Sequence, residues 1–504
     1  GAVDLQAPVT DYVPQFDVSG PWPASDMAVW NLLTHSTGFP DRLFFTDIDG
    51  PRTESALTEW AGDQSEVRLY APPGSFWNYS NPNFILAGLV AERASGIPYH
   101  EYVENNVWAA AGMTRTMFLP SEALAYGNYT YGHFTDPFTG EPVIIAPDAY
   151  DNWWAAPAGY AFSTPGDLVK WALLLMDGGG DVLSPESAAA MQAEQIWLHY
   201  TPTQYYGYGV LADEFWGVET RDHPGNVPGW GSTLLWVPER NFAVSVLGNT
   251  TSSMYSSLYC ATAVMLGLQP PQNPPDYSTD PDTWGRYVGT YDVLDYEVLD
   301  PAGIEFEAVV TKEEDDLRLS FPTLRDPLTL TAPYSRTLTQ AFLDTFLFDI
   351  NLDGTPDLDL TFIDDPEAPG EVKWMRNRVF VGTRAAVPQG TDTLTVRAFV
   401  DYRCDGFFQD GLDAPLREAS VRLSFPNGAW ITRQVRPFGL VNFSGFDAAD
   451  GVAVTVDLPE GYQGYALGHC PNSPGNIRLQ SDDFQFGYKL VQFGAGVAGE
   501  AAGP

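Results

Sequence analysis

The feature that most constrains the fold is a proline-rich segment that separates two regions of different pattern. Five prolines fall within residues 269–282, and such a composition forms a stiff, extended connector. Residues 1–268 mix helix-like and strand-like periodicities, whereas the residues after the connector show short β-rich runs without helical periodicity. The sequence pattern therefore predicts a mixed α/β domain followed by smaller all-β domains.

Helix starts before the connector share a proline in the first turn. Pro82 opens an apolar run that continues to Ser95 and stops at Gly96. The same signal recurs at Pro165 and Pro185, each of which follows a serine or threonine that can cap the helix. These segments predict the helices of the first domain.

Strand patterns dominate from residue 231 onward. The runs 231–237 and 242–247 read as a hairpin, so the first domain is expected to contain an antiparallel sheet. Residues 284–388 predict a small antiparallel β-barrel and residues 389–493 an immunoglobulin-like β-sandwich, followed by a Gly/Ala-rich tail over 494–504. The fold class is therefore multidomain, with an α+β domain, a barrel and a sandwich in that order.

The charge balance excludes some partners. Asp and Glu number 65 against 25 Lys and Arg, which gives a formal net charge of -40. Such a surface repels nucleic acid and anionic membranes, so neither is an expected partner. It suits an extracellular or bacterial cell-surface setting, although acidity that only keeps the protein soluble explains it equally well. No apolar run is long enough to span a bilayer.

The three cysteines are too few for a disulfide scaffold. Cys260 lies in an apolar, helix-like run over 256–268 and is expected to be a buried free thiol. Cys404 and Cys470 both lie in the last predicted domain and would pair if that domain is extracellular. The first residues do not form a signal peptide, so we expect a processed N-terminus.

A set of short blocks precedes the connector, and one of them is Tyr79-Ser80-Asn81, directly before the predicted helix at Pro82. A Tyr-x-Asn tripeptide alone carries no information, because it is common in loops. Its value comes from the accompanying blocks, which are NLLTHSTGFP at 31–40, PPGSFWN at 72–78, AGYAFST at 158–164, YGYGV at 206–210 and HPGNVPG at 223–229.

In order and spacing these blocks resemble the serine β-lactamase-like hydrolases, which include class C β-lactamases, penicillin-binding proteins, D-aminopeptidases and related esterases. The resemblance covers residues 1–268, and relatives also carry a following barrel. It implies a β-lactamase-like transpeptidase fold. It also implies an acyl-enzyme mechanism, in which a serine of a Ser-x-x-Lys helix attacks a carbonyl and water regenerates it.

The resemblance implies a role for five residues. Tyr79 would share the work of general base with the helix lysine, and Asn81 would hold that lysine and the substrate amide. His223 occupies the place of the lysine in a Lys-Thr-Gly strand, Gly225 would keep the strand flat against the substrate, and the backbone N–H of Asn226 would form one arm of the oxyanion hole. Taken singly, Tyr79 is better explained as a core aromatic residue at a helix start and His223 as a turn histidine; taken together, the motifs favour an active site.

The nucleophile itself is absent from the sequence. Lysines occur at 170, 312, 373 and 489, and the residues three positions earlier are Asp167, Val309, Gly370 and Phe486, so no Ser-x-x-Lys exists. In relatives that helix lies shortly upstream of the segment matching residues 3–12. We therefore expect an N-terminal segment, either a separate fragment or residues before Gly1, to supply serine and lysine. His35, in the block at 31–40, is interpreted as a structural histidine whose hydrogen bonds are satisfied.

Two acidic segments predict structural calcium. One follows the spacing of a calcium loop, with glycine at its sixth position and Asp359 in place of the usual final glutamate; its ligands would be Asp349, Asn351, Asp353, Asp357 and Asp359. An Asx-rich turn is the alternative. The other, in the last domain, is similar to B-type repeats of bacterial surface adhesins; its ligands would be Asp401, Asp405, Asp410 and Asp413.

Two functions follow. The first is an extracellular serine hydrolase acting on peptides, amides or esters, with no cofactor needed for catalysis and with the N-terminal fragment as partner. The second is a degenerate relative that serves as a structural or adhesive component of a cell surface or filament. His223 in place of lysine favours esterase or peptidase activity over β-lactamase activity, because a dedicated β-lactamase grips its substrate carboxylate with a cation.

Overall fold

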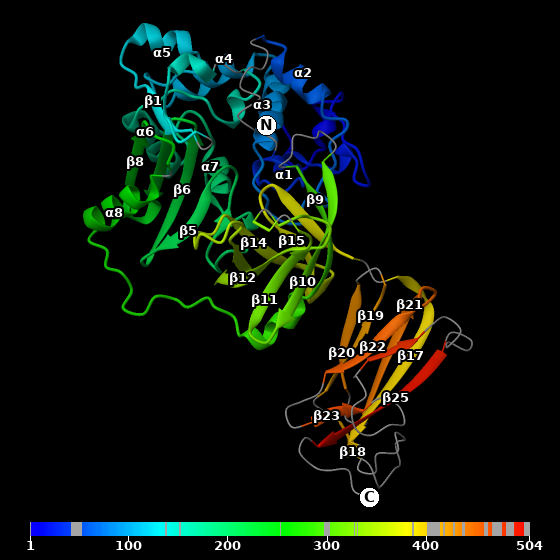
Figure 1. The fold of residues 1–504 in the computed structure, drawn as a ribbon. Coiled ribbons are helices and arrows are strands. Elements are labelled where there is room, and N and C mark those ends of the chain that lie inside the picture. Colours follow the sequence, from blue (N-terminus) through cyan, green and yellow to red (C-terminus); the bar gives the residue numbers. More distant parts are fainter. Residues whose placement is uncertain are drawn as a thin grey trace, which may run out of the picture. The chain divides into compact units, whose positions relative to one another are not determined.

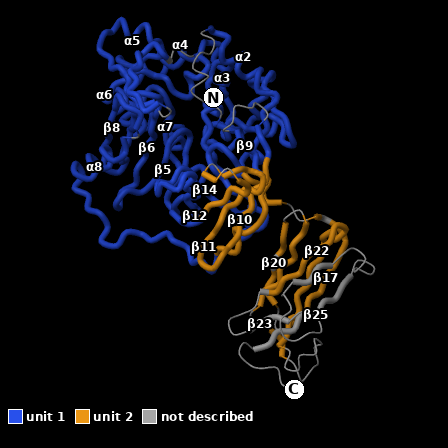
Figure 2. The backbone as a smooth tube through the Cα atoms, in the orientation of Figure 1, with its two compact units in different colours: residues 1–283, 293–305, 338–381 blue, residues 284–292, 306–337, 382–504 orange. Residues whose placement is uncertain are grey.

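We describe a computed structural model of the chain. The residues it describes are 2–41, 53–136, 139–150, 153–252, 254–296, 303–326, 328–329, 331–385, 388–400, 414–416, 419–426, 429–435, 439–457, 462–465, 476–479 and 488–497. The chain forms two compact units, coloured separately in Figure 2. One contains residues 1–283, 293–305 and 338–381, and the other contains 284–292, 306–337 and 382–504.

The region before the connector holds the helices, as predicted. They are α1 (Val29–Leu33), α2 (Ala56–Gly62), α3 (Asn81–Ser95), α4 (Tyr99–Val103), α5 (Pro120–Tyr126), α6 (Pro165–Met176), α7 (Pro185–Gln192) and α8 (Tyr255–Leu266). Gly96 ends α3 in the left-handed conformation at φ 69°, which glycine adopts without strain. At α6, Thr164 is the N-cap, and its Oγ1 accepts from the Asp167 amide at 3.3 Å.

A six-stranded antiparallel sheet lies in the same region. Its strands, in spatial order, are β3 (Ile196–Trp197), β4 (Tyr205–Tyr206), β5 (Leu211–Phe215), β6 (Val218–Val227), β7 (Trp230–Val237) and β8 (Phe242–Gly248). Trp236 packs against α6 on one face of the sheet, and Leu235 packs against α8 on the other, because successive strand residues point to opposite faces. A separate two-stranded sheet pairs β1 (Gly132–Thr135) with β2 (Pro142–Ile145).

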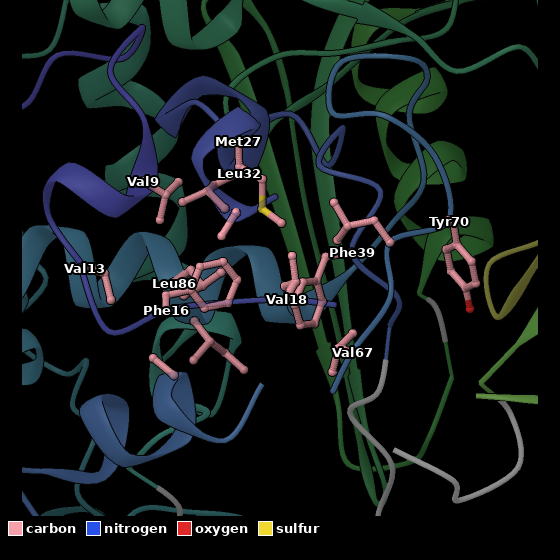
Figure 3. Packing of buried hydrophobic residues seen from close by; sticks show 14 of the residues in the cluster. Val9, Val13, Phe16, Val18, Met27, Leu32, Phe39, Val67, Tyr70 and Leu86 are labelled. Atoms are coloured by element: carbon pink, nitrogen blue, oxygen red, sulfur yellow. The ribbon is translucent and has the colours of Figure 1, made fainter. Parts of the chain in front are cut away.

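The main hydrophobic core of the first unit forms around α1 and α3. Leu32 of α1 and Leu86 of α3 are fully buried and lie beside Phe16 from the N-terminal segment, as Figure 3 shows. The same cluster includes Trp374 from the β-rich part of the unit, so the core continues beyond residue 268.

An eight-stranded closed barrel follows the connector, which confirms the predicted barrel (Figure 1). Its strands are β9 (Gly289–Asp295), β10 (Ile304–Glu313), β11 (Asp316–Phe321), β12 (Tyr334–Phe342), β13 (Thr345–Phe348), β14 (Leu358–Asp365), β15 (Ala368–Arg376) and β16 (Phe380–Arg384). Buried residues alternate along β11, with Leu317, Leu319 and Phe321 facing inward.

The last region contains two further sheets. One comprises β17 (Gln389–Val400), β18 (Ala414–Pro415), β21 (Leu440–Phe446), β23 (Tyr462–Tyr465) and β25 (Tyr488–Val497). The other comprises β19 (Ser420–Ser424), β20 (Trp430–Gln434), β22 (Val452–Asp457) and β24 (Asn476–Leu479). Leu394 and Val454, one from each sheet, belong to one buried cluster. The immunoglobulin-like topology and the adhesin resemblance stay predictions.

The structure corrects the interpretation of one of the three cysteines. Cys260 is free but exposed on α8, so its predicted burial was wrong. Its apolar neighbours do not enclose it, because Val264 and Met265 on α8 are 76% and 71% exposed. The predicted disulfide partners Cys404 and Cys470, and the second acidic segment with Asp401, Asp405, Asp410 and Asp413, lie outside the described residues. In the described part of the chain, we find no helix with the length and apolar character to span a membrane.

Candidate functional site

Tyr79, Asn81 and His223 lie together, as the sequence motifs predicted. Tyr79 precedes α3, Asn81 is its first residue and His223 lies on β6. The ring centroids of Tyr79 and His223 are 6.3 Å apart, and the Tyr79 hydroxyl lies 3.4 Å from Asn81 Oδ1. The start of α3 and the middle of the sheet therefore form one candidate site.

The block at 31–40 holds the tyrosine segment in place. His35 adopts a left-handed backbone conformation at φ 51°, and its carbonyl accepts from the Asn78 amide at 2.8 Å. In the same block, position 38 requires glycine, because a Cβ on Gly38 would lie 2.3 Å from the Ala71 carbonyl oxygen. These contacts fix the backbone that leads into Tyr79.

The Tyr79 phenol is largely enclosed by aromatic rings. Its ring centroid is 4.3 Å from that of His35. Burial raises the pKa of Tyr79 to about 12, against the lowering effect of the Arg378 charge, and Asp41 raises it further. Tyr79 is therefore protonated at neutral pH in this arrangement, and a further positive charge would be needed for it to act as a base.

An acid and an arginine that the sequence interpretation missed complete the surroundings of Tyr79. Asp41 Oδ1 accepts from the Asn81 amide at 3.1 Å and from Asn81 Nδ2 at 3.2 Å. Arg378, from the turn between β15 and β16, donates from Nε to Asp41 Oδ2 at 2.7 Å and lies 4.6 Å from the Tyr79 ring centroid. The arginine comes from the barrel, so no local sequence signal could have placed it here.

His223 is neutral and uses both ring nitrogens. Nδ1 lies 2.7 Å from the Pro224 carbonyl, which can only accept, so Nδ1 carries the proton. Nε2 then accepts from the Tyr206 hydroxyl at 2.9 Å. Burial lowers the pKa of His223, although its hydrogen bond to the Pro224 carbonyl opposes that effect. The residue that stands where relatives carry lysine is therefore not a cation at neutral pH.

Two buried donors beside this cluster have no partner in the described part of the chain. His35 Nδ1 accepts from the Ser80 amide at 3.2 Å, which leaves the proton on Nε2, and Nε2 has no hydrogen-bond partner. The Trp77 indole N–H is also unpaired, and its ring lies 6.5 Å from that of Tyr79. The interpretation of His35 as a satisfied histidine was therefore wrong for Nε2, and an unpaired buried donor costs about 1–3 kcal/mol.

Gly225 and Asn226 follow His223 on β6. Gly225 pairs with Ser232 of β7, and a Cβ at Gly225 would lie 2.4 Å from the Ser232 hydroxyl, so the absence of a side chain permits this close packing. Asn226 pairs with Gly231 and is exposed. Their roles in holding substrate and oxyanion stay predictions.

Two of the lysines are engaged away from the site. Lys170 donates to the Asp167 carboxylate at 2.8 Å at the start of α6. Lys373 lies 3.2 Å from Asp365 and 4.8 Å from the Trp374 ring centroid.

The first acidic segment forms a tight turn in which carboxylates accept backbone amides. Asp349 accepts from Leu352 and Gly354 at 2.7 and 2.9 Å, and Asp357 accepts from Ile350 at 2.7 Å. Asp359 instead accepts from the Tyr200 hydroxyl at 3.0 Å. Within the described ranges no group of three or more acidic, histidine or cysteine side chains is placed to hold a metal ion. Calcium binding at this turn stays a prediction.

If calcium binds this turn in the folded state only, it will stabilise the protein by mass action. We expect the melting temperature to rise in excess calcium and to fall in chelator. The Asp353→Asn variant should lose most of that difference, whereas Asp292→Asn on β9 should retain it. A melting temperature that is equal in calcium and in chelator would exclude the site.

The comparisons with known proteins cover the region that carries this site. The beta-lactamase family model matches residues 1–269. The unguisins hydrolase ungD' of Aspergillus campestris is 28% identical over 265 residues, which cover 50% of this chain and 47% of that protein. The D-aminopeptidase of Gluconobacter oxydans is 24% identical over 295 residues, covering 57% and 52%. The chain thus spans about half the length of these two relatives.

One solved structure supports the fold. The crystal structure of SurE superposes with a TM-score of 0.53 at 21% identity, over 76% of this chain and 82% of that chain. At this identity the likeness concerns the fold alone. Together with the family model, which covers more than half of the residues, these findings show that the chain belongs to the beta-lactamase family.

Proposed function

We propose that this protein is a serine hydrolase that cleaves peptide, amide or ester bonds through an acyl-enzyme. The observation that carries the proposal is the convergence of Tyr79 and Asn81 with His223, which lies in a distant part of the sequence. Members of the family that match this chain include a hydrolase, a D-aminopeptidase and penicillin-binding protein 4 of Amycolatopsis lactamdurans. Substrates with an amide or ester carbonyl are therefore the class to test.

The proposed reaction needs a serine and a lysine that these 504 residues do not provide as Ser-x-x-Lys. We infer that a segment outside this sequence supplies them. The serine oxygen would bond to the substrate carbonyl carbon while its proton passes to Tyr79, and the amine or alcohol would leave with that proton. Water would then cleave the ester, releasing the acid and regenerating the serine.

Features of the described structure support such a segment. His35 Nε2 and Trp77 Nε1 are buried donors without a partner beside Tyr79, where a polar group would satisfy them. At the sheet edge, β8 carries the apolar sequence FAVSVLG, and all seven of its residues are only partly buried. An apolar edge strand favours pairing with a further strand. We propose that the segment with the nucleophile adds a strand at β8 and fills the space beside Tyr79.

A lysine delivered with that serine would change the protonation of Tyr79. A cation within about 4–6 Å lowers the pKa of a phenol, and Tyr79 needs that change because burial raises its pKa to about 12. His223 would serve as a neutral hydrogen-bonding residue rather than as a cation. This favours neutral amides and esters over substrates that must be held by a carboxylate, as in a dedicated β-lactamase.

An extracellular or bacterial cell-surface location also remains our proposal, on the basis of the acidic composition. The alternative function is a degenerate structural or adhesive component. It would be favoured if the complete protein shows no serine that reacts with a fluorophosphonate probe.

A fluorophosphonate probe tests the enzyme proposal on protein produced from its complete gene. We expect covalent labelling of a serine, with intact-mass measurement under denaturing conditions locating the label on a segment outside residues 1–504. A labelled small fragment that co-purifies with this chain would indicate cleavage, and a label on one longer chain would indicate an uncut enzyme. The absence of labelling in both forms would overturn the hydrolase proposal.

A further inference from the structure

The turn between β15 and β16 is held firmly against the candidate site. Its Asn377 side chain is buried, and Oδ1 accepts from the Val379 amide at 3.1 Å. The Tyr70 hydroxyl donates to the Val379 carbonyl, and Asn78 Nδ2 donates to the Arg378 carbonyl at 3.4 Å. Segments that directly precede Tyr79 therefore bind the backbone of a barrel turn.

The turn places the Arg378 side chain against the buried carboxylate of Asp41. Arg378 Nε and Nη2 lie 2.7 and 2.5 Å from the same oxygen of Asp41, whose side chain is 6% exposed. The other Asp41 oxygen accepts both from the backbone amide and from Nδ2 of Asn81. Because Nδ2 is directed at Asp41, Asn81 Oδ1 is left facing the Tyr79 hydroxyl. One chain of contacts therefore runs from Arg378 through Asp41 and Asn81 to Tyr79.

Arg378 also acts on Tyr79 through space. Its guanidinium carbon lies 4.6 Å from the ring centroid, and its charge lowers the pKa of Tyr79 while Asp41 raises it. The two charges are opposed, so removing either one shifts the ionisation of the phenol in a known direction. The Arg378 side chain is 54% exposed, which places the expected shift at the low end for a neighbouring charge, about one pH unit.

We propose that Arg378 is a positioning residue of the hydrolase site, supplied by the barrel, that orients Asn81 through Asp41 and favours the ionised form of Tyr79. The importance of this for turnover rests on the proposed function. The contacts of Arg378 do not depend on that function. The proposal can therefore be tested by a measurement that does not require hydrolytic activity.

The alternative is that Arg378 and Asp41 form only a structural ion pair. Four variants separate the two roles. Arg378→Gln removes the charge, Arg378→Lys keeps the charge but not the planar fork, and Asp41→Asn removes the opposing charge. Arg318→Gln is the matched control, because Arg318 is a barrel arginine whose exposed partner is Glu313.

The first measurement is the alkaline titration of Tyr79, taken as tyrosinate absorbance of each variant minus the same variant carrying Tyr79→Phe. We expect Arg378→Gln to move the transition upward by about one pH unit and Asp41→Asn to move it downward. Arg378→Lys should restore most of the shift, and Arg318→Gln should leave the transition unchanged. If Arg378→Gln and Arg318→Gln titrate alike, the proposal is overturned.

The second measurement is the pH profile of hydrolysis by the complete protein. For Arg378→Gln we expect kcat to fall about tenfold, because the acidic limb of the pH profile, which reports the ionisation of the base Tyr79, is displaced to higher pH; KM should change little. Arg378→Lys should recover the position of the limb but not the full kcat, since Asn81 stays misoriented. A fall in kcat without displacement of the limb would assign Arg378 a structural role and overturn its electrostatic one.

The two proposals fail separately. If the titration shifts as expected but no serine is labelled, the inference about Arg378 stands and the hydrolase proposal falls. If a serine is labelled and the titration of Tyr79 ignores Arg378, the inference falls and the hydrolase proposal stands.

Discussion

The Tyr79→Phe variant of the complete protein is expected to lose hydrolysis by about 10²–10⁴-fold, the usual contribution of a positioned general base. The substitution removes one oxygen and leaves the ring against His35, whose centroid is 4.3 Å away, so folding should be unaffected. The loss should appear in kcat rather than in KM, because the proton transfer occurs in the transition state. Steady-state kinetics with an amide and an ester substrate provide the measurement.

The matched control is Tyr126→Phe, since Tyr126 lies at the end of α5 and is 52% exposed. It should keep full activity. Labelling by the fluorophosphonate probe should slow in parallel with hydrolysis in the Tyr79 variant. Activity within twofold of the parent would remove Tyr79 from the proposed chemistry and leave it as a core aromatic residue.

The Asp222→Asn variant is expected to be more stable than the parent, by about 4 kcal/mol at pH 8 and by less than half of that at pH 5. Asp222 is 2% exposed on β6 and accepts from the Tyr255 hydroxyl at 2.7 Å. Burial raises its pKa from 3.8 to about 7; the hydrogen bond from Tyr255 opposes this rise, and the charge of Asp213 adds to it.

The direction of the pH effect follows from proton binding. The folded protein holds the Asp222 proton more tightly than the unfolded chain, so this carboxyl weakens the fold as pH rises from about 4 to about 7. Asparagine can still accept from Tyr255 and carries no charge. Urea denaturation at both pH values measures the difference, with Glu219→Gln on the same strand as an exposed control. An equal gain at pH 5 and pH 8 would contradict the predicted titration.

Much of the fold could be predicted because its signals are local. The proline at the start of α3 and the glycine after it define that helix within a short window, and the β7–β8 hairpin has the strand pattern and turn of its class. The closed barrel was also predicted, since helical periodicity ends at the connector. Tyr79 and His223 could be placed together only because several motifs occur in a known order.

The rest of the site depends on contacts that local patterns do not encode. Asp41 and Arg378 are 337 residues apart, and neither belongs to a recognised motif. The protonation of His223 depends on Tyr206 and a carbonyl that the register of the strands brings to it. His35 was predicted to be satisfied because its block resembles an architectural rather than a catalytic segment of the family, but a single sequence cannot show where each ring nitrogen points.

The buried Arg376 at the end of β15 has a consequence for how this protein could be recombined. Its guanidinium, 2% exposed as a residue, donates to the carbonyls of Trp77 and Leu198 and lies 5.1 Å from the Trp77 ring centroid. A chimera cut at the proline-rich connector, with a barrel from elsewhere, would leave both carbonyls without their donor, at a cost of about 1–3 kcal/mol each. The connector therefore marks a break in secondary structure but not an exchangeable module boundary, and evolution or engineering must replace the two sides of this contact together.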